Sequence, residues 1–582
     1  MPTIAVTSPA LAAVWPTVKG MSAFSDALRT AAQGPTGMTT GEPHEPVRTP
    51  WAEVHAKARA GARVLAAHGV GPGDAVAVLA AKPFEVAPIA QAAWLAGASV
   101  TMLHQPTART NLMTYAEDTA AVLSLVGAKA AVLGDPFTDF VELLDGSGVR
   151  AFTVDQLVAE PGGPAPDVEI GEDLPALLQL TSGSTSTPKA VRITHRNLWA
   201  NIESMCDAAQ IRPGEVMVSW LPLFHDMGMV GFLTLPMCRG IELVTVTPTD
   251  FLASPMIWPK LISKYRGTIT AAPNFAFALT ARVLARPANR ELDLDLSTMR
   301  FALNGAEPID VDAVRAFLAA GAPFALPQTS VVCAYGMAEA SLAVSFHPWG
   351  TPLRVDTVEA DALESDRRAV PAVRGRSFPV LGPPLAGIEV CVRDADGATL
   401  GDREVGVLHL RGDCVTSQYL TMDGPVVTQD LDGWLDTGDL GYLIDGDVVV
   451  CGRVKDVIIM GGRNIYPTDI ERAAQAVDGV RAGNAVAVRW TTPSGRESFA
   501  VAVESRDAAN IDAAERIRHE VRSAVTAEIG ARPAAVAVLP VGRLPKTPSG
   551  KLRRSAAAKL IVAPEPSLPT QPSAPEQVAL PG

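Results

Sequence analysis

Short apolar runs alternate with amphipathic stretches along the first 350 residues of the chain. Hydrophobic positions at helical spacing over residues 51–68 predict an amphipathic helix that ends at the turn Gly71–Asp74. Ala75–Leu79 and Ala98–Met102 are continuous apolar runs typical of buried strands, and Phe84–Leu95 between them is a predicted helix. Because strands that alternate with helices form parallel sheets, this part predicts an α/β domain.

The pattern changes in the second half of the chain. It weakens where charges cluster, and residues 351–378 are predicted to be an inserted, partly exposed segment. Short alternating strands with glycine turns over Ile388–Leu420 predict a small β-subdomain. We therefore expect a large N-terminal domain, residues 1–451, with mostly parallel sheets and this subdomain. A small mobile α+β domain, residues 452–560, and a Pro-rich disordered tail, residues 561–582, should follow.

Composition excludes several classes of protein. With 582 residues, 48% hydrophobic and 19% charged, the chain is typical of a globular enzyme with more than one domain. A net charge of −13 without a long basic run argues against a nucleic-acid partner. The six cysteines are scattered, which disfavours zinc and a disulfide framework. No apolar stretch approaches the ~20 residues of an integral membrane segment, and the N-terminus lacks signal-peptide features, so we expect a cytoplasmic protein.

One polar loop, residues 181–189, offers a candidate for phosphate binding. It reads Thr-Ser-Gly-Ser-Thr-Ser-Thr-Pro-Lys and follows an apolar run that ends at Leu180. Small residues let backbone N–H groups converge, hydroxyls donate further hydrogen bonds, and Lys189 adds charge. Its spacing differs from the P-loop G-x-x-x-x-G-K-S/T. Taken alone, such a run is more often a polar surface loop.

Six further motifs follow the loop at intervals. They are Trp220–Gly228 (WLPLFHDMG), Asn304–Pro308 (NGAEP), Tyr335–Glu339 (YGMAE), Trp434–Asp439 (WLDTGD), Gly452–Asp456 (GRVKD) and Pro545–Lys551 (PKTPSGK). Together with the loop, and in this order, they resemble the adenylate-forming superfamily of acyl-CoA synthetases, luciferases and peptide-synthetase adenylation domains. The resemblance covers about residues 50–555 and implies the attack of a carboxylate on the α-phosphorus of ATP, with release of pyrophosphate.

The resemblance also implies roles for individual residues. The ATP-binding candidates are Thr181, Ser182, Gly183, Ser184, Thr185 and Lys189 for the phosphates, Gly305, Ala306, Glu307 and Tyr335 around adenine, Asp439 at the ribose, Arg453 at the ribose or the phosphates, and Gly336 and Met337 next to Tyr335. Glu339, with Thr181, would hold Mg²⁺, which prefers carboxylate and phosphate oxygens. Lys551 would be the catalytic residue that stabilises charge as the bond forms, and Lys455 the hinge of the small domain.

Each of these residues also has an ordinary structural interpretation. An aspartate beside a glycine, such as Asp439, is commonly a turn former, and Tyr335 alone would be a core aromatic. His225 within an apolar run is more often a hydrogen-bonded structural histidine. The order of the motifs favours the functional interpretation for the set as a whole.

Within the superfamily the chain looks most like the fatty acyl-AMP ligases, which pass acyl groups to an acyl carrier protein or a synthase carrier domain. The features are the motif around His225, the Ala272–Phe277 and Leu303–Pro308 segments, Gly462–Pro467, and the 351–378 insertion. A fatty acid needs an apolar pocket, and its candidate lining residues are His225, Met229, Gly231, Phe232, Phe275 and Phe277.

Three alternatives remain open. The first is a fatty acyl-CoA synthetase, since Lys189 does not separate the two branches. The second is a stand-alone amino-acid adenylation enzyme, which the 31 residues after Lys551 disfavour as part of a fused carrier assembly. The third is a catalytically inactive binding or scaffold protein, against which the presence of Tyr335, Glu339, Asp439 and Lys551 argues.

Overall fold

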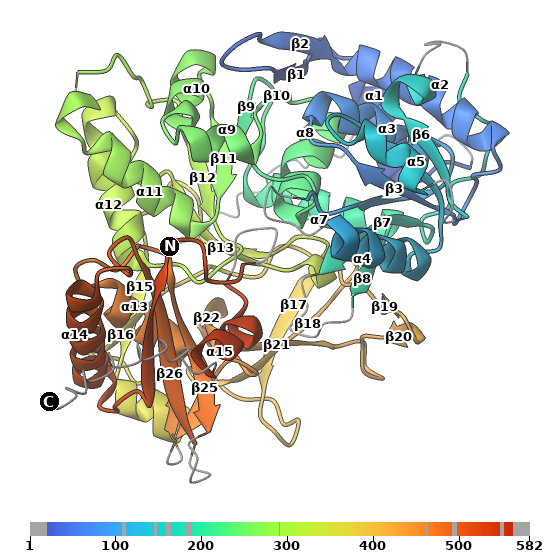
Figure 1. Cartoon of the computed structure of the whole chain (residues 1–582). Coiled ribbons are helices and arrows are strands. Elements are labelled where there is room, and N and C mark those ends of the chain that lie inside the picture. The colour runs from blue at the N-terminus through green and yellow to red at the C-terminus, as the bar shows by residue number, and fades with distance from the viewer. Residues whose placement is uncertain are drawn as a thin grey trace, which may run out of the picture. The chain divides into compact units, whose positions relative to one another are not determined.

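The computed structural model describes residues 20–106, 112–144, 148–158, 164–181, 188–289, 291–460, 463–491, 497–546 and 552–562. The chain divides into two compact units, Met1–Lys455 and Asp456–Gly582 (Figure 1). Most of the tail that the sequence predicts to be disordered lies outside the described residues. The two units are described separately below.

An eight-stranded sheet crosses the first unit in the order β14-β13-β12-β11-β9-β10-β1-β2. Every pair from β1 to β13 is parallel, and only the two outer strands run antiparallel to their neighbours. The strands are β1 (Gly37–Thr40), β2 (Val47–Pro50), β9 (Val216–Ser219), β10 (Glu242–Thr245), β11 (Ile269–Ala272), β12 (Phe301–Asn304), β13 (Val331–Gly336) and β14 (Ala343–Phe346). Buried parallel strands of this kind are almost continuously apolar, as the sequence of β13 illustrates.

A second eight-stranded sheet has the order β20-β19-β8-β7-β4-β3-β5-β6. Its β7-β4-β3-β5-β6 half is parallel, whereas β7, β8, β19 and β20 pair antiparallel. The strands are β3 (Ala75–Leu79), β4 (Ser99–Met102), β5 (Ala128–Leu133), β6 (Arg150–Thr153), β7 (Pro175–Thr181), β8 (Lys189–Thr194), β19 (Gln418–Thr421) and β20 (Gly424–Val427).

The expected small β-subdomain is a four-stranded antiparallel sheet in the order β17-β18-β21-β22. Its strands are β17 (Ile388–Arg393), β18 (Gly406–Gly412), β21 (Leu435–Ile444) and β22 (Asp447–Arg453). The predicted bounds were wrong at one end, because Leu420 lies on β19 and pairs with Ala190 in the second large sheet. The subdomain instead ends with β22, since two further strands complete its pairing.

The predicted insertion is more ordered than its charges suggest. It contains β15 (Val355–Val358), a π-helical turn η6 (Ala362–Asp366) and the start of β16 (Arg376–Pro379), and the two strands pair with each other. Glu364 and Arg376 form an ion pair in which both side chains are buried. The Tyr442 hydroxyl donates to Asp356 Oδ2 at 2.7 Å, which fastens the insertion to the four-stranded sheet.

Helices cover the two large sheets. The longer ones are α1 (Ala23–Ala31), α2 (Trp51–Ala67), α3 (Pro83–Leu95), α4 (Leu112–Leu125), α7 (His195–Ala208), α10 (Ile257–Tyr265), α11 (Asn274–Leu284) and α12 (Val311–Gly321). The shorter ones are η1 (Thr138–Phe140), α5 (Val141–Leu144), α6 (Val154–Val158), η2 (Met227–Thr234), α8 (Leu235–Arg239), α9 (Pro248–Ala253), η3 (Pro287–Asn289), η4 (Ala322–Phe324) and η5 (Ala338–Ala340). α3 is buried on nearly every side, and it packs along α2 (Figure 1).

The first turn of α3 carries a buried carboxyl group. The Glu85 side chain is 10% exposed, and its nearest cation, Lys82 Nζ, lies 3.9 Å from Oε1. A Cβ added at Gly134 would come within 2.3 Å of Oε2, so the carboxyl is enclosed tightly. Burial raises the pKa of Glu85 from 4.5 to about 7.

The second unit is a small α+β domain. A three-stranded sheet, β25-β26-β27, combines an antiparallel pair with a parallel one, and β23 and β24 form a separate ribbon. The elements are β23 (Ile458–Met460), β24 (Arg463–Ile465), α13 (Pro467–Gln475), β25 (Ala485–Thr491), β26 (Glu497–Ser505), α14 (Ile511–Ile529), β27 (Ala535–Pro540) and α15 (Arg554–Val562). The expected fold class, a large α/β domain with a small α+β domain, is confirmed.

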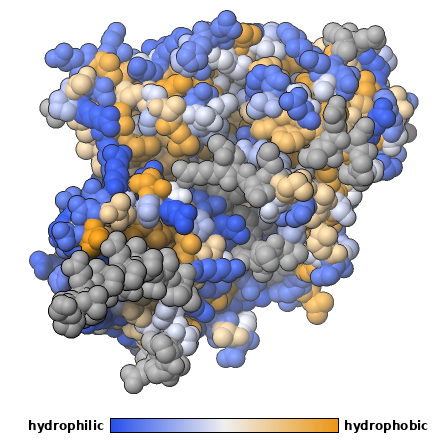
Figure 2. All heavy atoms as spheres, viewed as in Figure 1, coloured by the Kyte–Doolittle hydropathy of each residue, from blue (hydrophilic) through white to orange (hydrophobic). Residues whose placement is uncertain are grey.

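The face drawn in Figure 2 mixes hydrophilic and hydrophobic residues. Among the residues that the structure describes, none of the helices combines the length and hydropathy that a membrane span requires.

Candidate active site

Two parallel neighbours, β12 and β13, set the position of the first two site segments. Asn304 at the end of β12 is the register partner of Cys333 on β13, so the chain leaves both strands at the same edge of the sheet. Such carboxyl edges are where α/β proteins bind ligands. Gly305, Ala306 and Glu307 follow β12, and Ala306 has a left-handed backbone with φ 70°. Glu307 Oε1 accepts the Phe275 N–H at 2.7 Å, which holds this turn against α11.

The turn after β13 requires a glycine. Pairing with β14 shifts register between Tyr335 and Gly336, and a Cβ at Gly336 would lie 2.2 Å from the carbonyl oxygen of Leu342. The chain then passes Met337, which is buried, and enters η5, where Glu339 is also buried. Three predicted nucleotide residues, Tyr335, Gly336 and Met337, therefore share one short, tightly packed segment with Glu339.

Tyr335, Asp439 and Arg453 form one cluster, the ribose triad. The Tyr335 hydroxyl donates to Asp439 Oδ2 at 2.7 Å, and Arg453 Nε lies 2.8 Å from Oδ1. Asp439 on β21 and Arg453 on β22 are directly opposed cross-strand partners. Burial raises the pKa of Asp439 although Arg453 and Tyr335 lower it, and burial with the nearby Asp439 charge raises the pKa of Tyr335. The Tyr335 hydroxyl thus forms a hydrogen bond with Asp439, the residue that is predicted from the sequence to bind the ribose.

Lys189, Glu339 and Tyr419 form a second cluster, the phosphate triad. Lys189 Nζ lies 3.8 Å from Glu339 Oε1 and 3.8 Å from the centre of the Tyr419 ring. The Tyr419 hydroxyl donates to the same Oε1 at 2.5 Å. Burial lowers the pKa of Lys189, the charge of Glu339 raises it, and the charge of Arg453, from the ribose triad, lowers it further.

The residues present fit a hard divalent cation held together with phosphate. Thr181 Oγ1 is buried without a hydrogen-bond partner among the described residues, and Thr181 is the cross-strand partner of Lys189. A hydroxyl and the Glu339 carboxylate are the oxygen donors that Mg²⁺ prefers. Within the described ranges no group of three His, Cys, Asp or Glu side chains is arranged to hold a metal ion.

Part of the predicted site lies outside the described residues. This holds for Ser182, Gly183, Ser184 and Thr185 of the phosphate loop and for Lys551, the candidate catalytic residue. Lys455, the candidate hinge, is exposed and is the last residue of the first unit.

The candidate acyl-pocket residues lie on two segments, the stretch from His225 through η2 and the helix α11. His225 Nδ1 lies 2.7 Å from Asp226 Oδ1, immediately before η2, where Met229, Gly231 and Phe232 are buried. On α11, Phe275 is half-buried with its ring 6.2 Å from that of Trp220.

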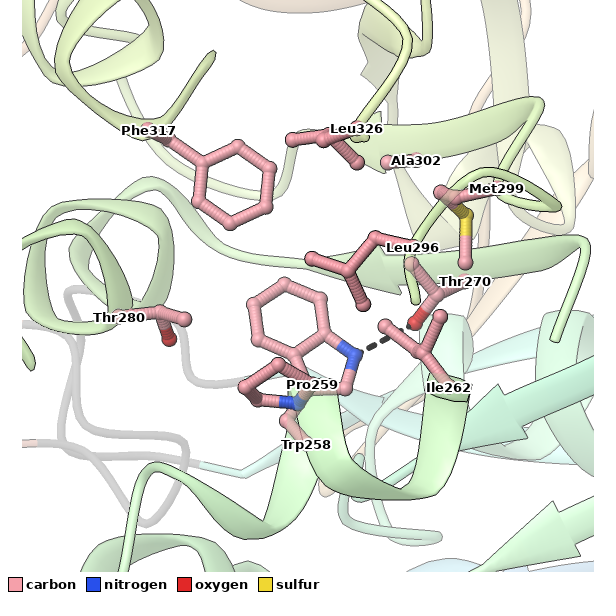
Figure 3. A pocket seen from close by; sticks show the side chains of 10 residues that line it. All are labelled: Trp258, Pro259, Ile262, Thr270, Thr280, Leu296, Met299, Ala302, Phe317 and Leu326. Carbon is pink, nitrogen blue, oxygen red and sulfur yellow. Dashed lines mark hydrogen bonds between the residues drawn. The ribbon is translucent and has the colours of Figure 1, made fainter. Parts of the chain in front are cut away.

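Phe277, two residues further on α11, is fully buried elsewhere. Its ring lies 5.4 Å from that of Trp258 and 4.9 Å from that of Phe317. Trp258 and Phe317 also line a void of about 10 Å³, in which the Trp258 indole N–H donates to Thr270 Oγ1 at 2.8 Å (Figure 3). A void of this size suits about one water molecule and is too small for an acyl chain. Phe277 is itself fully buried among the residues of the hydrophobic core.

Two polar residues at the site were missed by the sequence predictions. Tyr419 lies on a strand outside every motif, and only the pairing of β19 with β8 brings it to Lys189. Asn304 is fully buried next to the adenine segment, and its Oδ1 has no hydrogen-bond partner among the described residues. Asn304 is the first residue of the motif Asn304–Pro308, so its motif could have identified it as a candidate site residue.

Comparison with known proteins identifies the family of the chain. Residues 29–420 match the family model described as AMP-binding enzyme, and residues 462–557 match the model described as AMP-binding enzyme C-terminal domain. The first match includes all three residues of the phosphate triad and Tyr335 of the ribose triad, but ends before Asp439 and Arg453.

Similar proteins carry names of related activities. A protein of Mycobacterium tuberculosis, named provisionally as a ligase, is 55% identical to this chain over 93% of this chain and 100% of its own length. A Caulobacter vibrioides protein, named provisionally as an acyl-CoA synthetase, is 35% identical over 92% of this chain and 94% of its own. A solved structure from work on fatty acyl-adenylate ligases of E. coli and L. pneumophila has a TM-score of 0.85 at 31% identity, covering 93% of this chain and 98% of that one. The chain therefore belongs to the family of AMP-binding enzymes and is a ligase that uses ATP to adenylate a carboxylic acid.

Proposed function

We propose that the protein converts a fatty acid to its acyl-adenylate and then transfers the acyl group to the phosphopantetheine thiol of an acyl carrier protein or carrier domain. The observation that carries the adenylation step is the pair of triads, which gathers two carboxylates and two cations at the carboxyl edge of the first large sheet. The similarity to fatty acyl-adenylate ligase structures supports a fatty acid as the substrate.

Different residues would bind the ribose, the adenine and the phosphates of ATP. Asp439, held by Tyr335 and Arg453, would accept the ribose hydroxyls, and Gly305, Ala306 and Glu307 with Gly336 and Met337 would line adenine. Lys189 and the loop that it ends would bind the β- and γ-phosphates. The carboxylate nucleophile is already ionised at neutral pH, so no general base is needed. Catalysis then depends on stabilising the negative charge of the two reacting anions and of the transition state.

Two groups would supply that stabilisation. Mg²⁺, held by Glu339 and Thr181, would neutralise charge on the phosphate oxygens. Lys551 would contact the carboxylate and the α-phosphate as the bond forms. Lys455, where the two units divide, would be the hinge that lets the second unit present Lys551 for adenylation and withdraw it for acyl transfer.

The insertion supports a carrier protein as the acceptor. Its two strands are fastened to the four-stranded sheet, which also carries Asp439 and Arg453 and ends two residues before Lys455. A firmly attached insertion at that sheet would restrict the movement of the second unit and disfavour the geometry that uses CoA. The alternative function is that of a fatty acyl-CoA synthetase. It is supported by the name of the Caulobacter relative.

One assay decides between the two acceptors. Purified protein is incubated with ATP, Mg²⁺ and fatty acids of increasing chain length, with CoA, with a phosphopantetheinylated carrier protein, or with neither. We expect acyl-adenylate to persist with CoA and to be consumed by the carrier. Abundant acyl-CoA without persisting acyl-adenylate would refute the proposed acceptor. An enzyme that forms no adenylate from any fatty acid would refute the proposed substrate class.

A further inference from the structure

Tyr419 contacts both charged members of the phosphate triad. Its hydroxyl donates to Glu339 Oε1 at 2.5 Å, and its ring lies 3.8 Å below Lys189 Nζ. The strand register explains the placement, because Thr421 is the direct partner of Lys189 and Tyr419 is therefore its diagonal neighbour on the same face. Diagonal pairs in antiparallel sheets are within reach of aromatic and long side chains.

Without Tyr419 the pair of Lys189 and Glu339 would be weakly fixed. Their charged atoms are 3.8 Å apart, which is longer than a hydrogen bond, and the Lys189 side chain is 31% exposed. Ion pairs of this kind hold two long side chains poorly. A hydrogen bond to an ionised carboxylate and an aromatic face under an ammonium group are both directional and stronger.

The ribose triad repeats this arrangement. There too a tyrosine hydroxyl donates to one carboxylate oxygen while a cation pairs with the carboxylate. A hydrogen bond to one oxygen limits how far a carboxylate can rotate. In the phosphate triad both contacts are made to Oε1 of Glu339, whereas in the ribose triad Tyr335 and Arg453 contact different oxygens of Asp439. In both triads the tyrosine therefore restricts the orientation of the acidic side chain.

We propose that Tyr419 is a positioning residue for nucleotide binding, whose hydroxyl orients Glu339 toward a divalent cation and whose ring holds Lys189 toward a phosphate. This inference rests on the proposed function, since it uses the roles given there to Glu339 and Lys189. It assigns two separable tasks to one side chain. The hydroxyl acts on the metal complex of the nucleotide, whereas the ring acts on the nucleotide with or without metal.

Two substitutions separate these tasks. Tyr419→Phe keeps the ring and removes the hydroxyl, and Tyr419→Leu removes both. Tyr442→Phe is the matched control, because the Tyr442 hydroxyl on β21 also donates to a buried carboxylate at 2.7 Å, that of Asp356 in the insertion. Thermal unfolding of each variant verifies that it is folded.

The measurement is calorimetric titration of the full-length protein with α,β-methylene-ATP, which is not cleaved between the α- and β-phosphates, with and without Mg²⁺. For Tyr419→Phe we expect binding of the Mg²⁺ complex to weaken about tenfold, as for the loss of a hydrogen bond to a charged group, while binding of the metal-free nucleotide stays unchanged. For Tyr419→Leu we expect both affinities to fall. Tyr442→Phe should alter neither.

Unchanged affinity of Tyr419→Phe for the Mg²⁺ complex would overturn the inference, as would an equal loss in Tyr442→Phe. If the wild-type protein binds the nucleotide equally well with and without Mg²⁺, the metal-binding role of Glu339 fails and the inference fails with it. Neither a fatty acid nor an acceptor is present in this titration, so errors in the proposed substrate or carrier leave its outcome untouched.

Discussion

Replacement of Glu85 by Gln should make the protein more stable at neutral and alkaline pH. Glu85 lies in the first turn of α3 and is almost fully buried, and within the described part of the chain Lys82, at 3.9 Å, is the one cation that pairs with it. Burial raises the pKa of Glu85 to about 7, whereas its ordinary value is 4.5. The folded state therefore binds a proton in a range of pH where the unfolded chain has already released it.

The sign and size of the effect follow from these two values. Below pH 4.5 the carboxyl is neutral in both states and costs nothing. As the pH rises from 4.5 to about 7, the free energy of unfolding falls by about 1.4 kcal/mol per pH unit, or about 3 kcal/mol in all, and above pH 7 it stays level. Glutamine has nearly the same shape and no charge, so it should remove this loss.

Thermal unfolding of wild type and Glu85→Gln between pH 4.5 and pH 8 tests the reasoning. With an unfolding entropy of about 2.1 cal/mol/K per residue over the 455 residues of the first unit, 3 kcal/mol corresponds to about 3 °C. We expect the two midpoints to differ little at pH 4.5 and by about 3 °C at pH 8, with the variant higher. Glu53→Gln, an exposed glutamate paired with Lys57, controls for the loss of a negative charge. Parallel pH profiles for wild type and Glu85→Gln would refute the reasoning.

Two further predictions concern the active site. Lys551→Ala should nearly abolish fatty-acid-dependent pyrophosphate exchange while leaving ATP binding largely intact, since its contact matters most as charge develops; exchange at a near-normal rate would show that Lys551 is misassigned. Asp439→Asn should weaken ATP binding by about 2 kcal/mol, or about 30-fold, because the ribose triad loses the charge shared by Arg453 and Tyr335; calorimetric titration measures this, and an affinity within about threefold of wild type would contradict it.

The fold was largely predictable because it depends on local pattern. Apolar runs such as Ala75–Leu79 became buried parallel strands, and the helix expected at Phe84–Leu95 is α3 with one residue more. Pairing between distant segments was not predictable in this way. The segment that ends at Leu420 has the same alternating pattern as the β-subdomain strands, and nothing local shows that it pairs with β8, more than 220 residues earlier.

The site was predictable to the extent that its residues lie in recognisable motifs. Glu339 and Asp439 were identified in this way, and the structure places both among cations and tyrosines. Tyr419 could not be found, because its role depends on a strand register rather than on neighbouring letters. Phe277 illustrates a related limit. An apolar residue beside a site looks the same in the sequence whether it faces a pocket or the core, and in the structure its ring packs against that of Phe317.

The pairing of β7 with β8 constrains how the phosphate loop can vary. Thr181 and Lys189 face each other across the two strands, so both ends of the intervening segment are anchored in the sheet. A strand cannot slide by one residue to absorb an insertion, because that would turn the buried Val191 and Ile193 toward the opposite face. Any insertion or deletion between Thr181 and Lys189 must therefore be accommodated by the intervening segment itself, without a shift in the register of the two strands.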